Sequence, residues 1–190
     1  MKIPLCVAVL AVMSSASCMN HDGTTRNRLT EILDREIRWP AELTAIKDSV
    51  RYPVAEFPNA VKLILYYGNR RCTLCSIAHL SDYDFFFGIS RKSRCRFKIV
   101  PLFAPRLCDV DETISLMANC ELPDTVYIDE DDRFGILNEP ILKNGYTSFL
   151  VDRENRIVLV GDPTANDAMR ELFRRTLDNM LAHDGVYAEE

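Results

Sequence analysis

The chain has 190 residues, with 23 Lys and Arg against 28 Asp and Glu and a formal net charge of −5 at pH 7. This acidic balance argues against nucleic acid as a partner, because phosphate backbones attract basic protein surfaces. The basic run "SRKSRCRFK" (residues 90–98) lies between predicted elements and indicates a solvated loop. The length and the 47% hydrophobic content fit one globular domain with a complete core.

The N-terminal stretch has the layout of a secretory signal: a basic Lys2, an apolar run from Ile3 to Met13, and small residues up to Cys18. The apolar run is too short to span a bilayer. Small residues before a cysteine resemble a bacterial lipobox, which predicts removal of residues 1–17 and lipid modification of Cys18. Ser15 stands where a lipobox usually has Leu, so cleavage without lipidation is the alternative. Either way we expect the mature chain in the bacterial cell envelope. A lipid on Cys18 would anchor it to a membrane, facing the periplasm or the cell surface.

After the signal, residues 18–60 are predicted as an extension that precedes a domain over residues 61–183. Residues 19–26 are polar and indicate a tether. Apolar residues at helical spacing predict an amphipathic helix over residues 25–39, ending at Pro40. The three prolines between residues 40 and 59 favour an irregular segment with room for one short strand.

From residue 61 onward the pattern alternates between strands and helices. Strands are expected at residues 61–68, 97–104 and 124–129; helices at residues 72–87, 109–122, 130–138 and 164–181; and a β-hairpin over residues 146–162 with its turn at Asp152 to Asn155. Strands that alternate with helices imply right-handed parallel crossovers, and the hairpin adds antiparallel strands. The sequence therefore predicts an α/β fold, a central mixed β-sheet with helices on both faces.

Two cysteines three positions apart, Cys72 and Cys75 in "RRCTLC", follow the first predicted strand and open the helix after it. Backbone N–H groups at such a junction favour a thiolate, and such sites lower a cysteine pKa from about 8.5 to roughly 3.5–7.5. The positive charges of Arg70 and Arg71 act in the same direction. Cys72 is therefore the expected nucleophile, and Cys75, one turn inside the helix, is the expected resolving thiol.

A metal site is the rival interpretation of this spacing. Structural zinc needs four ligands, and the sequence has no second C-x-x-C and no paired histidines. His79 could share a helix face with Cys75, but a lone helical histidine is typically a partly buried structural residue. The acidic run from Asp129 to Asp132 lacks the ligand pattern of a calcium loop and indicates a charged surface. We therefore expect no metal and no cofactor.

The remaining cysteines leave their pairing open. Cys108 and Cys120 flank a predicted helix and could form a structural bridge, which would leave Cys95 single.

Residues 61–181 resemble the thioredoxin-like superfamily, in particular its envelope-anchored thiol-disulfide oxidoreductase and redoxin branch. The motifs that carry the resemblance are "RRCTLC", the hairpin "SFLVDRENRIVLVGDP", and "DTVYID" together with "FGILNEP". The N-terminal "REIRWPAEL" is similar to the extension of thioredoxin-like bacterial lipoproteins. The resemblance implies a thioredoxin-like fold and thiol-disulfide exchange with protein or peptide substrates. A separate reductant or oxidant partner would have to recharge the pair.

The chain departs from the family pattern at two places. Arg71 precedes the first cysteine where an aromatic residue is common, and Thr73 and Leu74 stand between the cysteines without Pro or Gly. Tyr146 stands where the family usually carries a cis-proline that faces the disulfide, and we expect its peptide bond to be trans because a non-proline cis bond costs about 2.5–4 kcal/mol. Arg71, Thr73, Leu74, Tyr146 and Thr147 are the candidates for a substrate groove.

Two functions follow as hypotheses. The first is a thiol-disulfide oxidoreductase acting through Cys72 and Cys75, with the direction of electron flow open. The second is a redox-inactive thioredoxin-fold binding or scaffold lipoprotein, which the missing proline at Tyr146 favours. Metal carriage is a third alternative.

Overall fold

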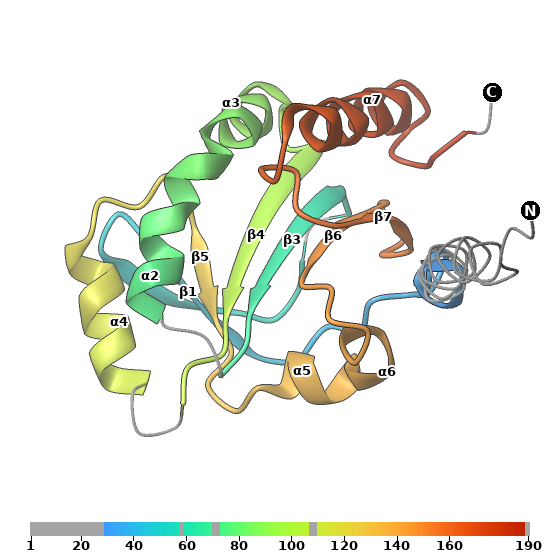
Figure 1. Ribbon diagram of the computed structural model, residues 1–190. Coiled ribbons are helices and arrows are strands. Elements are labelled where there is room, and N and C mark those ends of the chain that lie inside the picture. Colours follow the sequence, from blue (N-terminus) through green and yellow to red (C-terminus); the bar gives the residue numbers. More distant parts are fainter. Residues whose placement is uncertain (1–28, 58, 70–72, 107–109, 189–190) are drawn as a thin grey trace, which may run out of the picture. The chain divides into compact units, whose positions relative to one another are not determined.

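The computed structural model describes residues 29–57, 59–69, 73–106 and 110–188 (Figure 1). The chain separates into two units, residues 1–33 and 34–190. Of the first unit only residues 29–33 are described, and residues 29–32 are helical. The predicted signal segment, residues 1–17, and Cys18 lie outside the described residues.

Within the described part of the second unit, seven strands form one mixed sheet in the order β2-β1-β5-β4-β3-β6-β7. The strands are β1 (Leu43–Lys47), β2 (Val50–Val54), β3 (Val61–Tyr67), β4 (Phe97–Phe103), β5 (Val126–Ile128), β6 (Ser148–Val151) and β7 (Ile157–Val160). β3, β4 and β5 run parallel, and the other neighbouring pairs are antiparallel. The parallel strands therefore end at one common edge of the sheet, toward which their arrowheads point in Figure 1.

Helices cover both faces of this sheet. The helical elements are α2 (Thr73–Ala78), the 3₁₀ helix η1 (His79–Tyr83), α3 (Asp84–Lys92), α4 (Val110–Asn119), α5 (Arg133–Leu137), α6 (Glu139–Leu142) and α7 (Asp167–Ala182). Leu63 and Leu65 of β3 belong to one buried cluster with apolar side chains of α3, α4 and α7. On the opposite face the ring of Tyr66 lies 5.3 Å from that of Phe134 in α5. β3 is thus buried on both sides, as its largely apolar sequence predicts. The predicted mixed sheet with helices on both faces is confirmed.

The predicted helix over residues 25–39 is wrong in its second half. Asp34 adopts a left-handed conformation with φ of 63°. The chain after it runs along the β6–β7 hairpin instead, where Ile37 N–H donates to the carbonyl of Asn155 at 2.8 Å. Ile157 N–H in turn donates to the carbonyl of Arg35 at 2.9 Å. The segment therefore satisfies polar backbone groups at the outer edge of β7, which a helix could not do.

The segment predicted as irregular, residues 40–59, contains two strands rather than one at most. β1 and β2 form a hairpin whose two-residue turn, Asp48 and Ser49, has φ angles of 49° and 62°. Two left-handed residues in succession give the turn type that matches the twist of paired strands. Pro53 is tolerated within β2 because that strand lies at the edge of the sheet.

The other predicted elements form near their expected positions, with one difference after Cys75. The predicted helix over residues 72–87 is broken by η1 and continues to Lys92, so the basic run begins inside α3 rather than in a loop. The hairpin β6–β7 and its turn are confirmed: Asp152 Oδ1 accepts the N–H groups of Glu154 and Arg156, each at 2.8 Å. α7 is also confirmed, and Asn166 caps it by accepting the N–H of Met169 at 2.9 Å.

Candidate redox site at the end of strand β3

The predicted cysteine pair follows β3, which ends at Tyr67: Cys72 directly precedes α2, which begins at Thr73, and Cys75 lies within α2. Cys72 and Arg71 lie outside the described residues. Thr73 is half-buried at the first position of α2, Leu74 follows it in the helix, and Cys75 is exposed. In Figure 1, α2 begins at the edge of the sheet where the parallel strands end. The predicted buried strand therefore precedes Cys72, and the predicted helix follows it.

The two groove candidates from the distant loop reach the same edge. The carbonyl of Thr147 accepts the N–H of Tyr66 at 2.8 Å, which places the segment before β6 beside the last residues of β3. Tyr146 and Thr147 are both half-buried. No cis peptide bond occurs among the described residues, so the bond expected to be trans at Tyr146 is trans. Residues 73–75 and 146–147 thus flank the strand that leads to Cys72.

A hydrogen-bond network that the sequence did not predict lies at this edge. Tyr66 donates a short hydrogen bond from its hydroxyl to Asp132 Oδ1, and Asn69 Nδ2 reaches Asp132 Oδ2 at 3.5 Å. Arg106 Nε lies 3.5 Å from the carbonyl of Asn69, so the network extends to the segment after β4. Burial, then the hydrogen bond to Asp132, raises the pKa of Tyr66 far above its usual value of 10. Tyr66 is therefore a neutral hydrogen-bond donor throughout the physiological range.

Two glycines make room for the Tyr66 hydroxyl. A Cβ on Gly68 would lie 2.8 Å from that oxygen, and a Cβ on Gly135 would collide with both the hydroxyl and the carboxylate of Asp132. Asp132 itself adopts a left-handed conformation with φ of 52° at the start of α5. The close approach of β3 and α5 at this point explains why glycine stands at both positions.

The acidic run predicted as a charged surface is partly buried. Asp129 is 2% exposed, and its Oδ2 accepts the N–H of Phe134 at 2.6 Å. Burial raises the pKa of the Asp129 carboxyl, opposed by its backbone hydrogen bonds. The prediction of a charged surface is wrong for Asp129, because this buried carboxylate holds the first turn of α5. It accepts one of the backbone N–H groups that have no partner within the helix.

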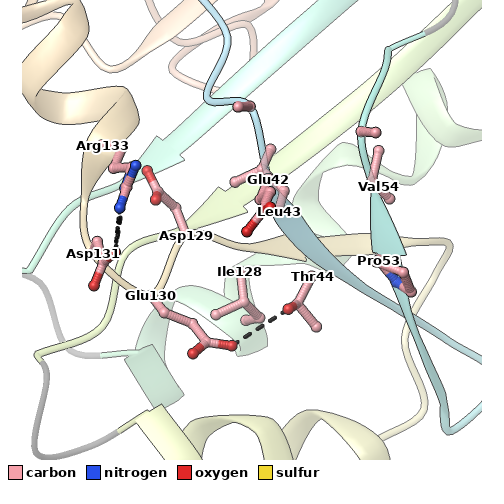
Figure 2. A pocket seen from close by; sticks show the side chains of 12 residues that line it. Glu42, Leu43, Thr44, Pro53, Val54, Ile128, Asp129, Glu130, Asp131 and Arg133 are labelled. Atoms are coloured by element: carbon pink, nitrogen blue, oxygen red, sulfur yellow. Dashed lines mark hydrogen bonds and ion pairs between the residues drawn. The ribbon is translucent and has the colours of Figure 1, made fainter.

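A cavity of about 660 Å³ lies beside this run, between the β1–β2 hairpin and the segment after β5 (Figure 2). Two of its acidic side chains have charged partners. Glu130 accepts from the Thr44 hydroxyl at 3.3 Å and lies 3.1 Å from Arg51 Nη2, and Asp131 lies 3.2 Å from Arg133. These pairs partly neutralise the acidic side chains, and no thiol of the described residues lines the cavity.

The described residues offer no set of ligands that would support the rival interpretation, a metal site. Among the described residues no three His, Cys, Asp or Glu side chains gather to hold a metal ion. The expectation that His79 is partly buried is wrong: its side chain is 72% exposed and its Nδ1 lies 3.0 Å from Asp82 Oδ2.

In the part of the chain that the structure covers, no helix has the length and apolarity needed to cross a bilayer.

Two further cysteines are among the described residues. Cys95 is exposed in a turn with φ of 67°, and Cys120 is half-buried after α4. Cys108 lies outside the described residues, so the bridge considered between Cys108 and Cys120 stays a prediction.

Comparisons with known proteins give structural but no sequence relatives. No protein-family model and no curated protein matches the chain. An uncharacterized conserved protein from Geobacillus kaustophilus is similar in structure, with a TM-score of 0.52, 12% identity, and coverage of 83% of this chain and 86% of that one. Enterococcus faecalis AhpC has a TM-score of 0.49 and 17% identity over 84% of this chain and 99% of its own. The exposed lipoprotein thioredoxin of Streptococcus pneumoniae has a TM-score of 0.45 and 15% identity over 71% and 99%.

The order of the elements from β3 to α7 matches the resemblance that the motifs indicated. Two parallel crossovers are followed by an antiparallel hairpin and a last helix, and the cysteine pair stands after the first strand of that series. The chain therefore has a thioredoxin-like fold.

Proposed function

We propose that this protein is a thiol-disulfide oxidoreductase of the bacterial cell envelope that acts on protein or peptide thiols through Cys72 and Cys75. The observation that supports the proposal is the place of the two cysteines along the chain: Cys72 stands between the end of the buried strand β3 and the start of α2, and the exposed Cys75 is in α2. A thioredoxin-like fold alone does not establish activity, so the proposal depends on these residues.

The chemistry assigned to the pair is a two-step exchange. The Cys72 thiolate attacks one sulfur of a substrate disulfide, so that a mixed disulfide forms and one substrate thiolate leaves. The Cys75 thiolate then attacks the Cys72 sulfur, releases the second substrate thiol and closes the Cys72–Cys75 disulfide. Two electrons pass to the substrate, and a separate dithiol partner has to return them. With a more oxidising pair the same steps run in reverse and a separate oxidant is the partner.

The groove candidates have the following roles in this proposal. Thr73 and Leu74 follow the nucleophile on α2, Arg71 favours its thiolate, and Tyr146 and Thr147 border the bound substrate. The Thr147 carbonyl already accepts the N–H of Tyr66, which supports a fixed position for this loop. Because Tyr146 replaces the usual proline, the backbone of the substrate has to be received in a different way from that in thioredoxin.

Cellular location belongs to the same proposal. Residues 1–17 would be removed as a signal, Cys18 would carry the lipid, and residues 18–60 would connect the anchor to a domain over residues 61–183. Labelling of cells with a radioactive fatty acid, with Cys18→Ala as the control variant, tests the anchor. Loss of label in that variant is expected, and equal label in both would contradict lipidation at Cys18.

The midpoint potential of the Cys72–Cys75 pair tests the redox proposal. Exchange proteins have potentials of roughly −120 to −270 mV, whereas structural disulfides lie below about −300 mV. We expect a value in the first range for the protein without its lipid, and the Cys72→Ser variant should show no transition there. A value in the second range would favour the alternative function, a redox-inactive binding or scaffold protein. The trans bond at Tyr146 favours that alternative.

A further inference from the structure

Lys62 is a buried cation on the face of the sheet opposite α3, α4 and α7. Its side chain is among the largest that are fully buried, and the residue is 1% exposed. Nζ donates to the carbonyl of Ala60 at 2.8 Å, and no carboxylate of the described residues lies within ion-pairing distance of it. An ammonium group has three N–H donors, so two remain without a protein acceptor in the described structure. Such a group carries a large desolvation cost unless an anion or another acceptor joins it.

The negative charge that partly compensates Lys62 belongs to Asp152, which forms no hydrogen bond or ion pair with it in the described structure. Burial is the main cause that lowers the pKa of Lys62 to about 8, and the charge of Asp152 partly opposes it. Asp152 cannot give its full hydrogen-bonding capacity to the lysine, because its Oδ1 accepts two backbone N–H groups of the β6–β7 turn. Lys62 is therefore an incompletely matched cation inside the fold.

A cavity of about 580 Å³ is lined by Lys62 and by an aromatic pair. The rings of Trp39 and Phe57 stack with centroids 3.9 Å apart and an interplanar angle of 24°. Trp39 Nε1 donates to Asn155 Oδ1 at 2.9 Å, which fixes the indole against the β6–β7 turn. The aromatic wall is thus held in place by contacts within the protein.

The charges at the rim of this cavity nearly balance. Arg153 lines it together with Glu56 and Glu154, and all three are exposed. Lys62 is the charged residue that is buried there. The lining of the cavity therefore includes one buried lysine and two aromatic side chains that stack on each other.

We propose that this cavity binds a small aromatic carboxylate, with the carboxylate on Lys62 and the ring against Trp39 and Phe57. The carboxylate would accept the two unmatched N–H groups and supply the missing negative charge through charge-assisted hydrogen bonds, which are stronger than those between neutral groups. The ring would stack in the offset or edge-on arrangements that aromatic pairs prefer. This site goes beyond the proposed redox function, because Lys62 is at the beginning of β3 and Cys72 follows its end.

The full chain offers a direct readout, because Trp39 is its one tryptophan. Titration with benzoate should quench the tryptophan fluorescence to saturation, whereas benzyl alcohol, which has the same ring without the charge, should bind at least about ten-fold more weakly. That factor is the loss expected from one hydrogen bond between charged partners.

Two variants and a control complete the experiment. Lys62→Met removes the ammonium group at similar volume and should weaken benzoate binding by about ten-fold or more. Lys47→Met removes an exposed lysine from β1 and should leave binding unchanged. Phe57→Ala keeps Lys62, removes half of the aromatic wall and should also weaken benzoate. Absence of saturable quenching, equal binding of benzyl alcohol, or unchanged benzoate affinity in folded Lys62→Met would each overturn the proposal.

Discussion

The hydroxyl of Tyr66 donates a hydrogen bond to the carboxylate of Asp132, and this bond joins the end of strand β3 to the start of helix α5. Replacement of Tyr66 by Phe removes this donor and keeps the ring that packs on Phe134. We expect the free energy of unfolding to fall by about 1.5–3 kcal/mol, the usual contribution of a hydrogen bond to a charged group. Urea denaturation measures the change.

Tyr127→Phe is the matched control for that variant. Tyr127 is a half-buried tyrosine on the same face, and its ring is tilted against that of Phe57 with the centroids 5.0 Å apart, but its hydroxyl makes no hydrogen bond with the described residues. Its replacement should change stability by less than about 0.5 kcal/mol. Similar losses in the two variants would show that the Tyr66–Asp132 hydrogen bond contributes nothing of its own.

The close approach at Gly135 gives a second prediction. Gly135→Ala places a Cβ against the Asp132 carboxylate and the Tyr66 hydroxyl, so a backbone shift or the loss of their hydrogen bond should destabilise the protein by about 1–3 kcal/mol. Gly88→Ala in α3 is the control, because no atom lies within 4 Å of the added Cβ. Alanine there should raise stability by up to about 1 kcal/mol through helix propensity. Thermal unfolding of both variants distinguishes the two sites.

The elements that could be predicted from sequence are those whose own side chains determine them. β3 is recognisable because all of its residues from Val61 to Tyr66 are buried, and α7 because its apolar residues recur at helical spacing. The β6–β7 hairpin carries its turn residues between two apolar runs. In each case the local pattern and the tertiary environment favour the same structure.

Residues 35–39 and the β1–β2 hairpin could not be predicted because distant contacts decide them. Ile37 has the spacing of a helix, yet it pairs with Asn155, more than a hundred positions away. In β2, Pro53 argues against a strand unless the strand is known to be at an edge, which only the sheet order reveals.

The candidate site divides in the same way. Cys72 and Cys75 can be proposed from the sequence because they form one local C-x-x-C motif. Tyr66 and Asp132 lie 66 positions apart and share no local motif. Gly68 is a possible signal, since a glycine directly after a buried strand is consistent with a close approach, but nothing in the sequence names its partner.

Replacement of the resolving cysteine tests the order of the exchange steps. In Cys75→Ser the mixed disulfide between Cys72 and a disulfide-bonded peptide can form but cannot be released, so we expect it to accumulate. Intact mass spectrometry after incubation with the peptide measures the adduct. Cys95→Ser is the control because Cys95 is an exposed cysteine outside the pair, and it should show no accumulation. An adduct on Cys95 in the Cys75→Ser protein, with none on Cys72, would contradict the assignment of the nucleophile.

The pH dependence of stability tests the state of Lys62. Its pKa is lowered from 10.5 to about 8 in the folded protein, with burial as the main cause. Between these two values the unfolded chain binds more protons at this residue than the folded one, so its contribution to the free energy of unfolding rises with pH across that window. Below about pH 8 the full cost of burying the charge remains.

The difference in the free energy of unfolding between the wild type and Lys62→Met isolates this group from other lysines and tyrosines. We expect that difference to shift in favour of the wild type by roughly 2–3 kcal/mol from pH 8 to pH 10.5 in urea denaturation. A difference that stays constant over this range would show that Lys62 keeps an ordinary pKa and is therefore solvated or fully paired, which would also weaken its assignment as the unmatched cation of the cavity.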